Sequence, residues 1–75
     1  MTEFRMPKPG DAITEAILLT VLVPDGAQVD EGSPLYVLET DKVEMEVVAP
    51  SAGTVRWSAE EGETYDVGTL LGVIE

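Results

Sequence analysis

One lysine in an acidic stretch is the residue whose setting in this sequence suggests chemistry. Lys42 has four carboxylate side chains close to it along the chain: Glu39, Asp41, Glu44 and Glu46. Neighbouring carboxylates favour the charged ammonium, which is not a nucleophile. A solvated turn lysine that offsets local negative charge would also fit this pattern. If Lys42 has a chemical role, we therefore expect it to be covalently modified and not catalytic.

The residue types on which most active sites and metal sites depend are missing. The sequence contains no cysteine and no histidine. This excludes disulfides, thiolate metal sites, thiol nucleophiles and His-based triads. Carboxylate pairs such as Glu44/Glu46 or Glu60/Glu61 could be proposed for hydrolysis, but solvated faces explain them better. We expect no metal site, no catalytic residues and no enzymatic activity of the chain's own.

Length and charge narrow the possible partners. The 75 residues predict a single domain, 1–75, and the 15 acidic against 4 basic side chains give a formal charge of −11. Such a surface repels nucleic acid and anionic lipid, so we expect neither as a partner. The hydrophobic content of 44% is too high for disorder. We expect a monomeric module in the bacterial cytoplasm, or in the mitochondrial matrix if the source is eukaryotic.

Glycine and proline interrupt the chain at short intervals and predict an all-β domain. The runs between them are rich in β-branched residues and cover residues 17–23, 35–39, 43–48, 54–58 and 69–74. In the run 43–48 the alternation predicts that Val43, Met45 and Val47 face the core while Glu44 and Glu46 face water. Residues 11–20 also fit helical spacing, but their β-branched side chains favour a loop followed by a strand.

An internal repeat predicts the architecture. Residues 25–39 match residues 61–75 at an offset of 36, with six identical pairs among fifteen. The half-repeats cover about 1–39 and 43–75, and a hairpin turn, 40–43, joins them. Two similar halves that each bury one face predict two four-stranded antiparallel sheets, packed as a flattened β-barrel or sandwich with quasi-two-fold symmetry. The first half carries about seven extra residues around 11–16, which we expect to form a surface loop.

The two halves differ at the segment that contains Lys42. The second half ends at Glu75, the equivalent of Glu39, so the connection after Glu39 has no counterpart. Thr40 and Asp41 suit a turn because short oxygen-bearing side chains bond their own backbone. Lys42 is therefore expected at an exposed hairpin tip, far from both termini.

The sequence around this turn resembles the attachment region of lipoyl domains, which belong to the acyltransferase (E2) components of 2-oxo acid dehydrogenase complexes. The residues that carry the resemblance are Leu38-Glu39-Thr40-Asp41-Lys42-Val43-Glu44-Met45-Glu46-Val47 and Ala49-Pro50-Ser51-Ala52-Gly53. The opening Met6-Pro7-Lys8-Pro9-Gly10-Asp11 and the closing segment 62–74 follow the same pattern, so the resemblance covers essentially the whole chain.

The resemblance implies that Lys42 carries lipoate in amide linkage and swings it between active sites. The implied partners are a lipoate-attaching enzyme, the E1 2-oxo acid decarboxylase, the E2 catalytic domain and the E3 dihydrolipoamide dehydrogenase. The residues expected to contact the ligase and these enzymes are Glu39, Thr40, Asp41, Val43 and Glu44. Val43 after the lysine is more similar to 2-oxoglutarate-type complexes, but the 2-oxo acid stays open.

Two alternatives share the expected fold. A biotinyl carrier domain of a carboxylase resembles Met-Lys-Met at the turn, whereas Asp41 and Val43 flank the lysine here. An unmodified lipoyl-like adaptor would leave Lys42 as an ordinary surface residue. The sequence also departs from the lipoyl pattern at Ala16, where glycine is common, and near Val21 or Leu22, where an aromatic residue is common.

Overall fold

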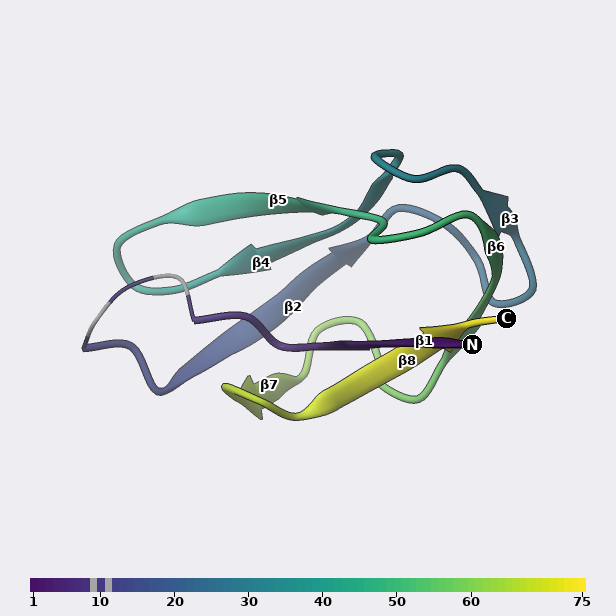
Figure 1. The fold of residues 1–75 in the computed structure, drawn as a ribbon. Coiled ribbons are helices and arrows are strands. Elements are labelled where there is room, and N and C mark those ends of the chain that lie inside the picture. The colour runs from purple at the N-terminus through teal and green to yellow at the C-terminus, as the bar shows by residue number, and fades with distance from the viewer. Residues whose placement is uncertain (9, 11) are drawn as a thin grey trace.

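Turn residues interrupt every apolar run, and the strands are correspondingly short. The computed structural model describes residues 1–8, 10 and 12–75, which contain strands but no helix. The strands are β1 (Thr2–Arg5), β2 (Glu15–Val21), β3 (Gln28–Val29), β4 (Pro34–Glu39), β5 (Glu44–Val48), β6 (Gly53–Trp57), β7 (Thr64–Asp66) and β8 (Leu70–Ile74). Figure 1 shows them as two layers with the chain termini at one end.

Five strands lie where the apolar runs predict them, within two residues at each end. The prediction missed β1, β3 and β7, because these strands are short and contain no apolar run. The predicted loop around 11–16 is shorter than expected, since β2 already begins at Glu15 and Ala16 is buried. Asp11 and Pro9 lie outside the described residues. The preference for a strand over a helix in this segment is confirmed from Glu15 onward.

The two sheets have related strand orders, and all their pairings are antiparallel. One sheet has the order β1-β8-β6-β3 and the other has the order β5-β4-β2-β7. The two orders correspond strand by strand: β1 to β5, β8 to β4, β6 to β2 and β3 to β7. Corresponding strands are four apart in the chain order, as the expected quasi-two-fold symmetry requires. However, each sheet takes strands from both halves. The expectation that each half forms its own sheet is therefore wrong, because the turns between strands send the chain from one layer to the other.

The turns repeat between the halves in backbone geometry as well as in sequence. Gly26 and Gly32 have φ of +88° each, and their counterparts Gly62 and Gly68 have φ of +90° and +91°. Side chains with a Cβ rarely adopt this left-handed conformation. The matched glycines therefore make the same chain reversals possible in both halves.

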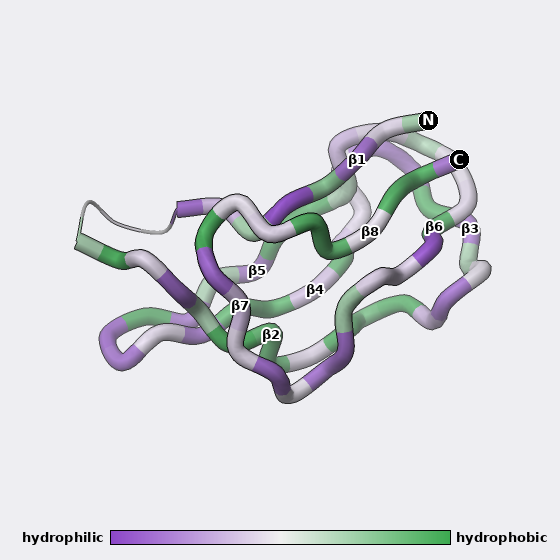
Figure 2. Tube along the Cα trace, turned by 90° about the horizontal axis from the view of Figure 1, so that it is seen from below, coloured by the Kyte–Doolittle hydropathy of each residue, from purple (hydrophilic) through white to green (hydrophobic). Residues whose placement is uncertain are grey.

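The core lies between the two sheets and is filled largely from alternate positions of the strands, although the neighbours Leu35 and Tyr36 are both buried where the register of β4 shifts. Its buried apolar residues are Phe4, Met6, Ala16, Leu18, Val29, Leu35, Tyr36, Leu38, Ala49, Val55, Leu71 and Ile74. Figure 2 shows hydrophobic stretches alternating with hydrophilic ones along the chain. Phe4 meets the half-buried Trp57 edge-on, with ring centroids 5.1 Å apart, and lies 6.3 Å from the ring of Tyr36. These three aromatic rings anchor β1, β4 and β6 to one another.

The strand β5 departs from its predicted burial. Val47 packs against the core as expected, but Val43 and Met45 keep 45% and 37% of their surface exposed. The end of the β4–β5 hairpin projects past the strands of the opposite sheet, which therefore do not cover these two side chains (Figure 1). The prediction that all three residues form one buried face is wrong for Val43 and Met45.

Candidate functional site

The β4–β5 hairpin places Lys42 at the end of the molecule. Leu38 pairs with Met45, and Glu39 pairs with Glu44, as the last residues of the two strands. A four-residue connection, 40–43, closes the hairpin. The amide of Thr40 donates a hydrogen bond of 2.8 Å to the carbonyl of Val43. Lys42 is exposed within this connection, on the opposite side of the molecule from the termini, as the sequence predicts (Figure 1).

The hydroxyl of Thr40 organises the turn from within. Its Oγ1 accepts the amide N–H of Lys42 at 3.2 Å and that of Val43 at 3.1 Å, and it lies 3.5 Å from the carbonyl oxygen of Val43. Local hydrogen bonds of this kind fix a turn that has no ladder partner. The turn role predicted for Thr40 is therefore confirmed. For Asp41, no side-chain hydrogen bond is found among the described residues, so the part of the turn prediction that concerns its side chain is not confirmed.

Lys42 is surrounded by negative charge without a fixed partner. In the described part of the chain the ion pairs belong to Arg5, with Glu3, and to Arg56, with Asp25 and Glu75; Lys42 takes part in none. Its ammonium therefore projects into water beside Glu39, Asp41 and Glu44. An amine in this setting can be reached by an enzyme that acylates it.

The groups with shifted pKa values lie away from this hairpin tip. The hydrogen bond and charge of Glu75 raise the pKa of Arg56, which lies on the sheet opposite Lys42. Burial raises the pKa of Tyr36 to about 12, and its hydroxyl has no hydrogen-bond partner among the described residues. Both shifts have structural causes, an ion pair and desolvation, that require no catalytic role.

An open groove of about 550 Å³ lies beside the turn 40–43. It is lined by residues 12–17 on one side and residues 39–41 on the other, together with Thr64. Of the predicted recognition residues, Glu39, Thr40 and Asp41 line this groove, whereas Val43 and Glu44 follow Lys42 toward β5. Ile13, Thr14 and Thr64 also line the groove, and the sequence did not predict them near the lysine. The extra segment of the first half was the available signal, but its position could not be read without the fold.

Other kinds of site are not found in the part of the chain that the structure describes. No group of three or more metal-ligating side chains comes together among these residues. Nor do they include any helix of the length and apolar character that a membrane crossing requires. The exposed amine on its fixed turn is therefore the candidate functional group.

Comparisons with known proteins match the whole domain. A family model described as "Biotin-requiring enzyme" matches residues 2–74. The chain is 43% identical, over 99% of its length, to the dihydrolipoyllysine-residue succinyltransferase component of the 2-oxoglutarate dehydrogenase complex of Bartonella vinsonii subsp. berkhoffii. It is 38% identical, over 97% of its length, to the dihydrolipoyllysine-residue acetyltransferase component of the pyruvate dehydrogenase complex of Corynebacterium glutamicum. The chain spans 18% and 11% of the length of these two relatives.

The fold has a solved counterpart. The solution structure of the lipoyl domain of the 2-oxoglutarate dehydrogenase complex from Azotobacter vinelandii matches with a TM-score of 0.83 and 29% sequence identity. The match covers 100% of this chain and 96% of that domain. The chain therefore belongs to the biotin/lipoyl family, within which it is a carrier domain of the lipoyl type.

Proposed function

We propose that Lys42 is the residue that carries lipoate, in amide linkage to Nζ. The observation that carries this proposal is the position of Lys42 at an exposed turn whose backbone Thr40 fixes. The residues present fit such a group, because the amine projects into water and no described side chain pairs with it. The similarity to lipoyl domains over the whole chain supports the same assignment.

The attachment step changes the charge of the turn. An amide bond forms between Nζ of Lys42 and the carboxyl carbon of activated lipoate, the activating group leaves, and the ammonium loses its protons and charge. The formal charge of the chain falls from −11 to −12. When bound, lipoate supplies the disulfide that accepts an acyl group together with two electrons. The domain itself positions the lipoyl group and is recognised by the partner enzymes, since the turn holds the backbone of Lys42 fixed while one partner enzyme replaces another.

The proposed partners are the lipoate-attaching enzyme and the E1, E2 and E3 enzymes of a 2-oxo acid dehydrogenase complex. The uncompensated carboxylates around the turn, Glu39, Asp41 and Glu44, would steer basic surfaces near the partner active sites toward Lys42. Thr40 and Val43 complete the surface that these enzymes would touch. We place this exchange in the bacterial cytoplasm, or in the mitochondrial matrix if the source is eukaryotic.

A second candidate function is biotin carriage on the same lysine. The description of the matching family model, "Biotin-requiring enzyme", supports it. The turn sequence favours lipoate, because Asp41 and Val43 stand where biotin-carrying domains have methionines. The amine geometry is the same for either cofactor, so the attaching enzyme must discriminate between them.

The experiment that tests the proposal is intact-mass analysis with peptide mapping after co-expression with a lipoate ligase or, separately, a biotin ligase. We expect a lipoyl adduct on Lys42 that is lost in Lys42→Arg. The Lys8→Arg variant is the matched control and should be modified like the parent. An adduct with biotin alone would assign the domain to carboxylases. Folded protein that takes up neither cofactor would leave the unmodified adaptor.

A further inference from the structure

The outer face of the sheet that carries Lys42 is unusually apolar. Residues that pair across strands share a face, so the outward side chains follow from the register. Val37 pairs with Thr20 on one side and with Glu46 on the other, and Ile17 pairs with Glu39. The outward apolar side chains are Ile17, Leu19, Leu22, Pro34, Val37 and Val48, which we call the apolar outer face. Among them Leu22 and Val48 keep 42% and 47% of their surface exposed.

A β-bulge enlarges this face. The register of β2 against β4 passes from Leu18–Leu38 to Thr20–Val37, so Leu19 and Thr20 together oppose Val37. Leu18 is fully buried, and Leu19 next to it is half-buried on the outside. The bulge therefore adds a leucine to the outer surface without disturbing the inward side chains.

The other sheet provides an internal control, because the quasi-two-fold symmetry relates the two outer faces. Val73 takes the place of Val37, and it pairs with Glu3 and Arg56 where Val37 pairs with Glu46 and Thr20. At two exposed positions, Leu22 and Val48, the difference is clear. The sequence offsets of 43 and 36 set Val48 against Arg5 and Leu22 against Ser58. Symmetry and folding therefore allow polar side chains at these positions, and folding alone does not require Leu22 and Val48.

Charge surrounds the apolar outer face on the side of the attachment turn. Glu39 and Glu44 lie on the same outer surface, between Val37 and the turn of Lys42, and Glu46 lies beside Val37. In the described part of the chain none of these carboxylates forms an ion pair. On the opposite outer face Arg5 and Arg56 are bound to acidic neighbours. The face near Lys42 therefore combines an apolar centre with a negative rim.

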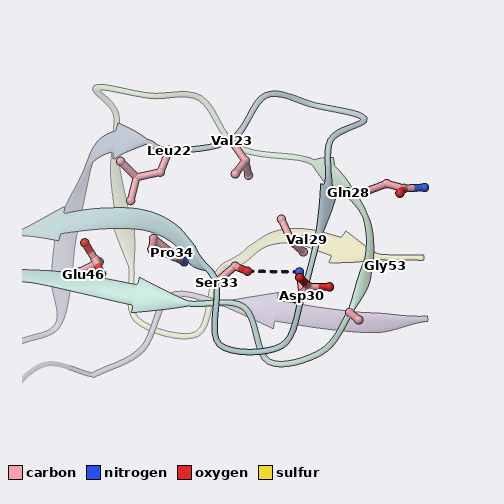
Figure 3. Close-up of a pocket in the computed structure, with 10 residues that line it drawn as sticks. Leu22, Val23, Gln28, Val29, Asp30, Ser33, Pro34, Glu46 and Gly53 are labelled. Atoms are coloured by element: carbon pink, nitrogen blue, oxygen red, sulfur yellow. Dashed lines mark hydrogen bonds between the residues drawn. The ribbon is translucent and has the colours of Figure 1, made fainter.

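At its other end the face opens into a hollow. Figure 3 shows Leu22, Pro34 and Glu46 on one side of the hollow and Val29 and Asp30 on the other. Its volume is about 980 Å³. The amide of Asp30 donates to the hydroxyl of Ser33 at 3.3 Å, which ties the two sides together at the base. A side chain that projects from a partner could enter here while the flat part of the partner covers Val37.

We propose that the apolar outer face is a docking surface for the 2-oxo acid decarboxylase that loads the arm. The complementary surface on that enzyme would have an apolar centre and a rim of lysine or arginine side chains. A second copy of this chain is a poorer occupant, since each copy carries a formal charge of −11. The proposal rests on the proposed function, because it names the step in which Lys42 approaches the decarboxylase active site.

The first test needs no modified lysine. The ¹⁵N-labelled unmodified domain is titrated with 2-oxoglutarate, pyruvate and branched-chain 2-oxo acid decarboxylases, and amide signal intensities are followed by NMR. We expect one of these enzymes to broaden the amides of Thr20, Val37 and Val48 more than those of Arg56 and Val73. Equal effects on both outer faces, or no effect with any of the three enzymes, would overturn the docking surface.

The second test measures transfer. The double variant Leu22→Ser/Val48→Ser is lipoylated and then acylated by the decarboxylase that responds in the first test. We expect KM for the domain to rise about tenfold, with kcat and the rate of lipoate ligation unchanged. The charge-neutral control Val73→Ser, on the opposite outer face, should leave KM within twofold of the parent. A double variant that is folded and keeps the parental KM would contradict the proposal.

The outcomes separate the two proposals. Failure of lipoate attachment would overturn the proposed function, while the titration of the unmodified domain would still test the surface. Normal attachment with an unaffected outer face would overturn the docking surface alone. Sedimentation velocity tests whether a second copy of this chain covers the apolar outer face. A dimer that Leu22→Ser/Val48→Ser dissociates would show that a second copy covers this face, and would also overturn the proposal.

Discussion

The two halves of the molecule have the same strand order and the same glycine turns, but they end differently. In the first half β4 runs into the hairpin that carries Lys42, whereas the equivalent strand β8 runs to the chain terminus beside β1. Symmetry thus relates the turn 40–43 at one end to the termini at the other (Figure 1). The shared elements build the framework, and Lys42 lies in the hairpin turn that joins the two halves.

The cores of the two halves also differ, in a compensating way. Tyr36 of β4 corresponds to Gly72 of β8 at the offset of 36 residues. A Cβ at Gly72 would collide with the carbonyl oxygen of Arg56 and with the ring of Phe4. In one sheet the ring of Phe4 on β1 occupies the space beside Gly72, while in the other sheet Tyr36 on β4 is itself the large group, with Val47 beside it in the pairing. Both large rings come from the first half of the chain, so the two halves are not interchangeable.

The largest effect is expected at Gly72. We predict that Gly72→Val costs more than about 3 kcal/mol of unfolding free energy, because the new side chain meets backbone as well as an aromatic ring. Urea denaturation followed by tryptophan fluorescence measures this cost. Val73→Ala, at the neighbouring half-buried position, is the control and should cost much less. A Gly72→Val variant with the parental midpoint would show that Phe4 and β6 can move apart freely.

The next effect is the pH dependence that Tyr36 imposes. Burial raises its pKa to about 12, from 10.0 in the unfolded chain. Above pH 10 the unfolded state therefore loses a proton that the folded state keeps, and stability falls as pH rises toward 12. We predict a loss of about 3 kcal/mol across this window, from two pKa units at 1.36 kcal/mol each.

The measurement is urea unfolding at a series of pH values from 8 to 12, which is about the range of the tyrosine titration. Tyr36→Phe should remove most of the loss and should leave stability at neutral pH unchanged or slightly raised, because a buried hydroxyl without a partner disappears. Tyr65→Phe is the control on the partly exposed tyrosine. If Tyr36→Phe lost as much stability at alkaline pH as the parent, the pH dependence would come from other groups.

The matched glycine turns give a smaller and symmetric prediction. Gly32→Val and Gly68→Val should each cost about 2 kcal/mol, because both residues have φ near +90° and neither would meet another side chain. The two costs should agree closely if the halves are equivalent at their turns. Thermal melts of the two variants test this. An unchanged melting temperature in either one, or a large difference between the two, would contradict the equivalence.

The smallest effect is expected at the turn 40–43, which carries Lys42. Thr40→Ala removes the acceptor of two amide hydrogen bonds and should cost about 1 kcal/mol. It should also slow lipoate ligation and speed amide exchange at Lys42 and Val43, and Thr40→Ser should restore both. Asp41→Ala is the matched control, which should fold and exchange like the parent. Loss of modification in folded Asp41→Ala would then report recognition and not turn geometry.

The sequence predicted the class of fold and the glycine turns because apolar runs and glycines recur in both halves. It predicted the position of Lys42 because the connection after Glu39 interrupts this repeat. Glu39 and Glu75 align, and only the first of them continues into a turn. The strands β3 and β7 could not be predicted, since two or three residues carry no periodicity. The exposure of Met45 was missed for a different reason. Alternation gives the face of a side chain but not the length of the opposing sheet.

The apolar outer face shows the same limit. The bulge at Leu19 interrupts the alternation of inward and outward side chains along β2. A prediction from strict alternation therefore assigns some outward residues of β2 to the wrong face. The groove beside the turn depends on where residues 12–17 pass, and spacing along the chain does not contain that information. Comparison of equivalent positions, such as Val48 and Arg5, was the one signal in the sequence that pointed to the outer face.

The position of the termini determines how this domain can be handled. Met1 and Glu75 lie together at one end of a body 32 Å long, and Lys42 lies at the other. An affinity tag, a surface anchor or a flexible tether fused at either terminus therefore leaves the lysine pointing away from its support. In each of these fusions, the long axis of the domain separates the hairpin that carries Lys42 from the support.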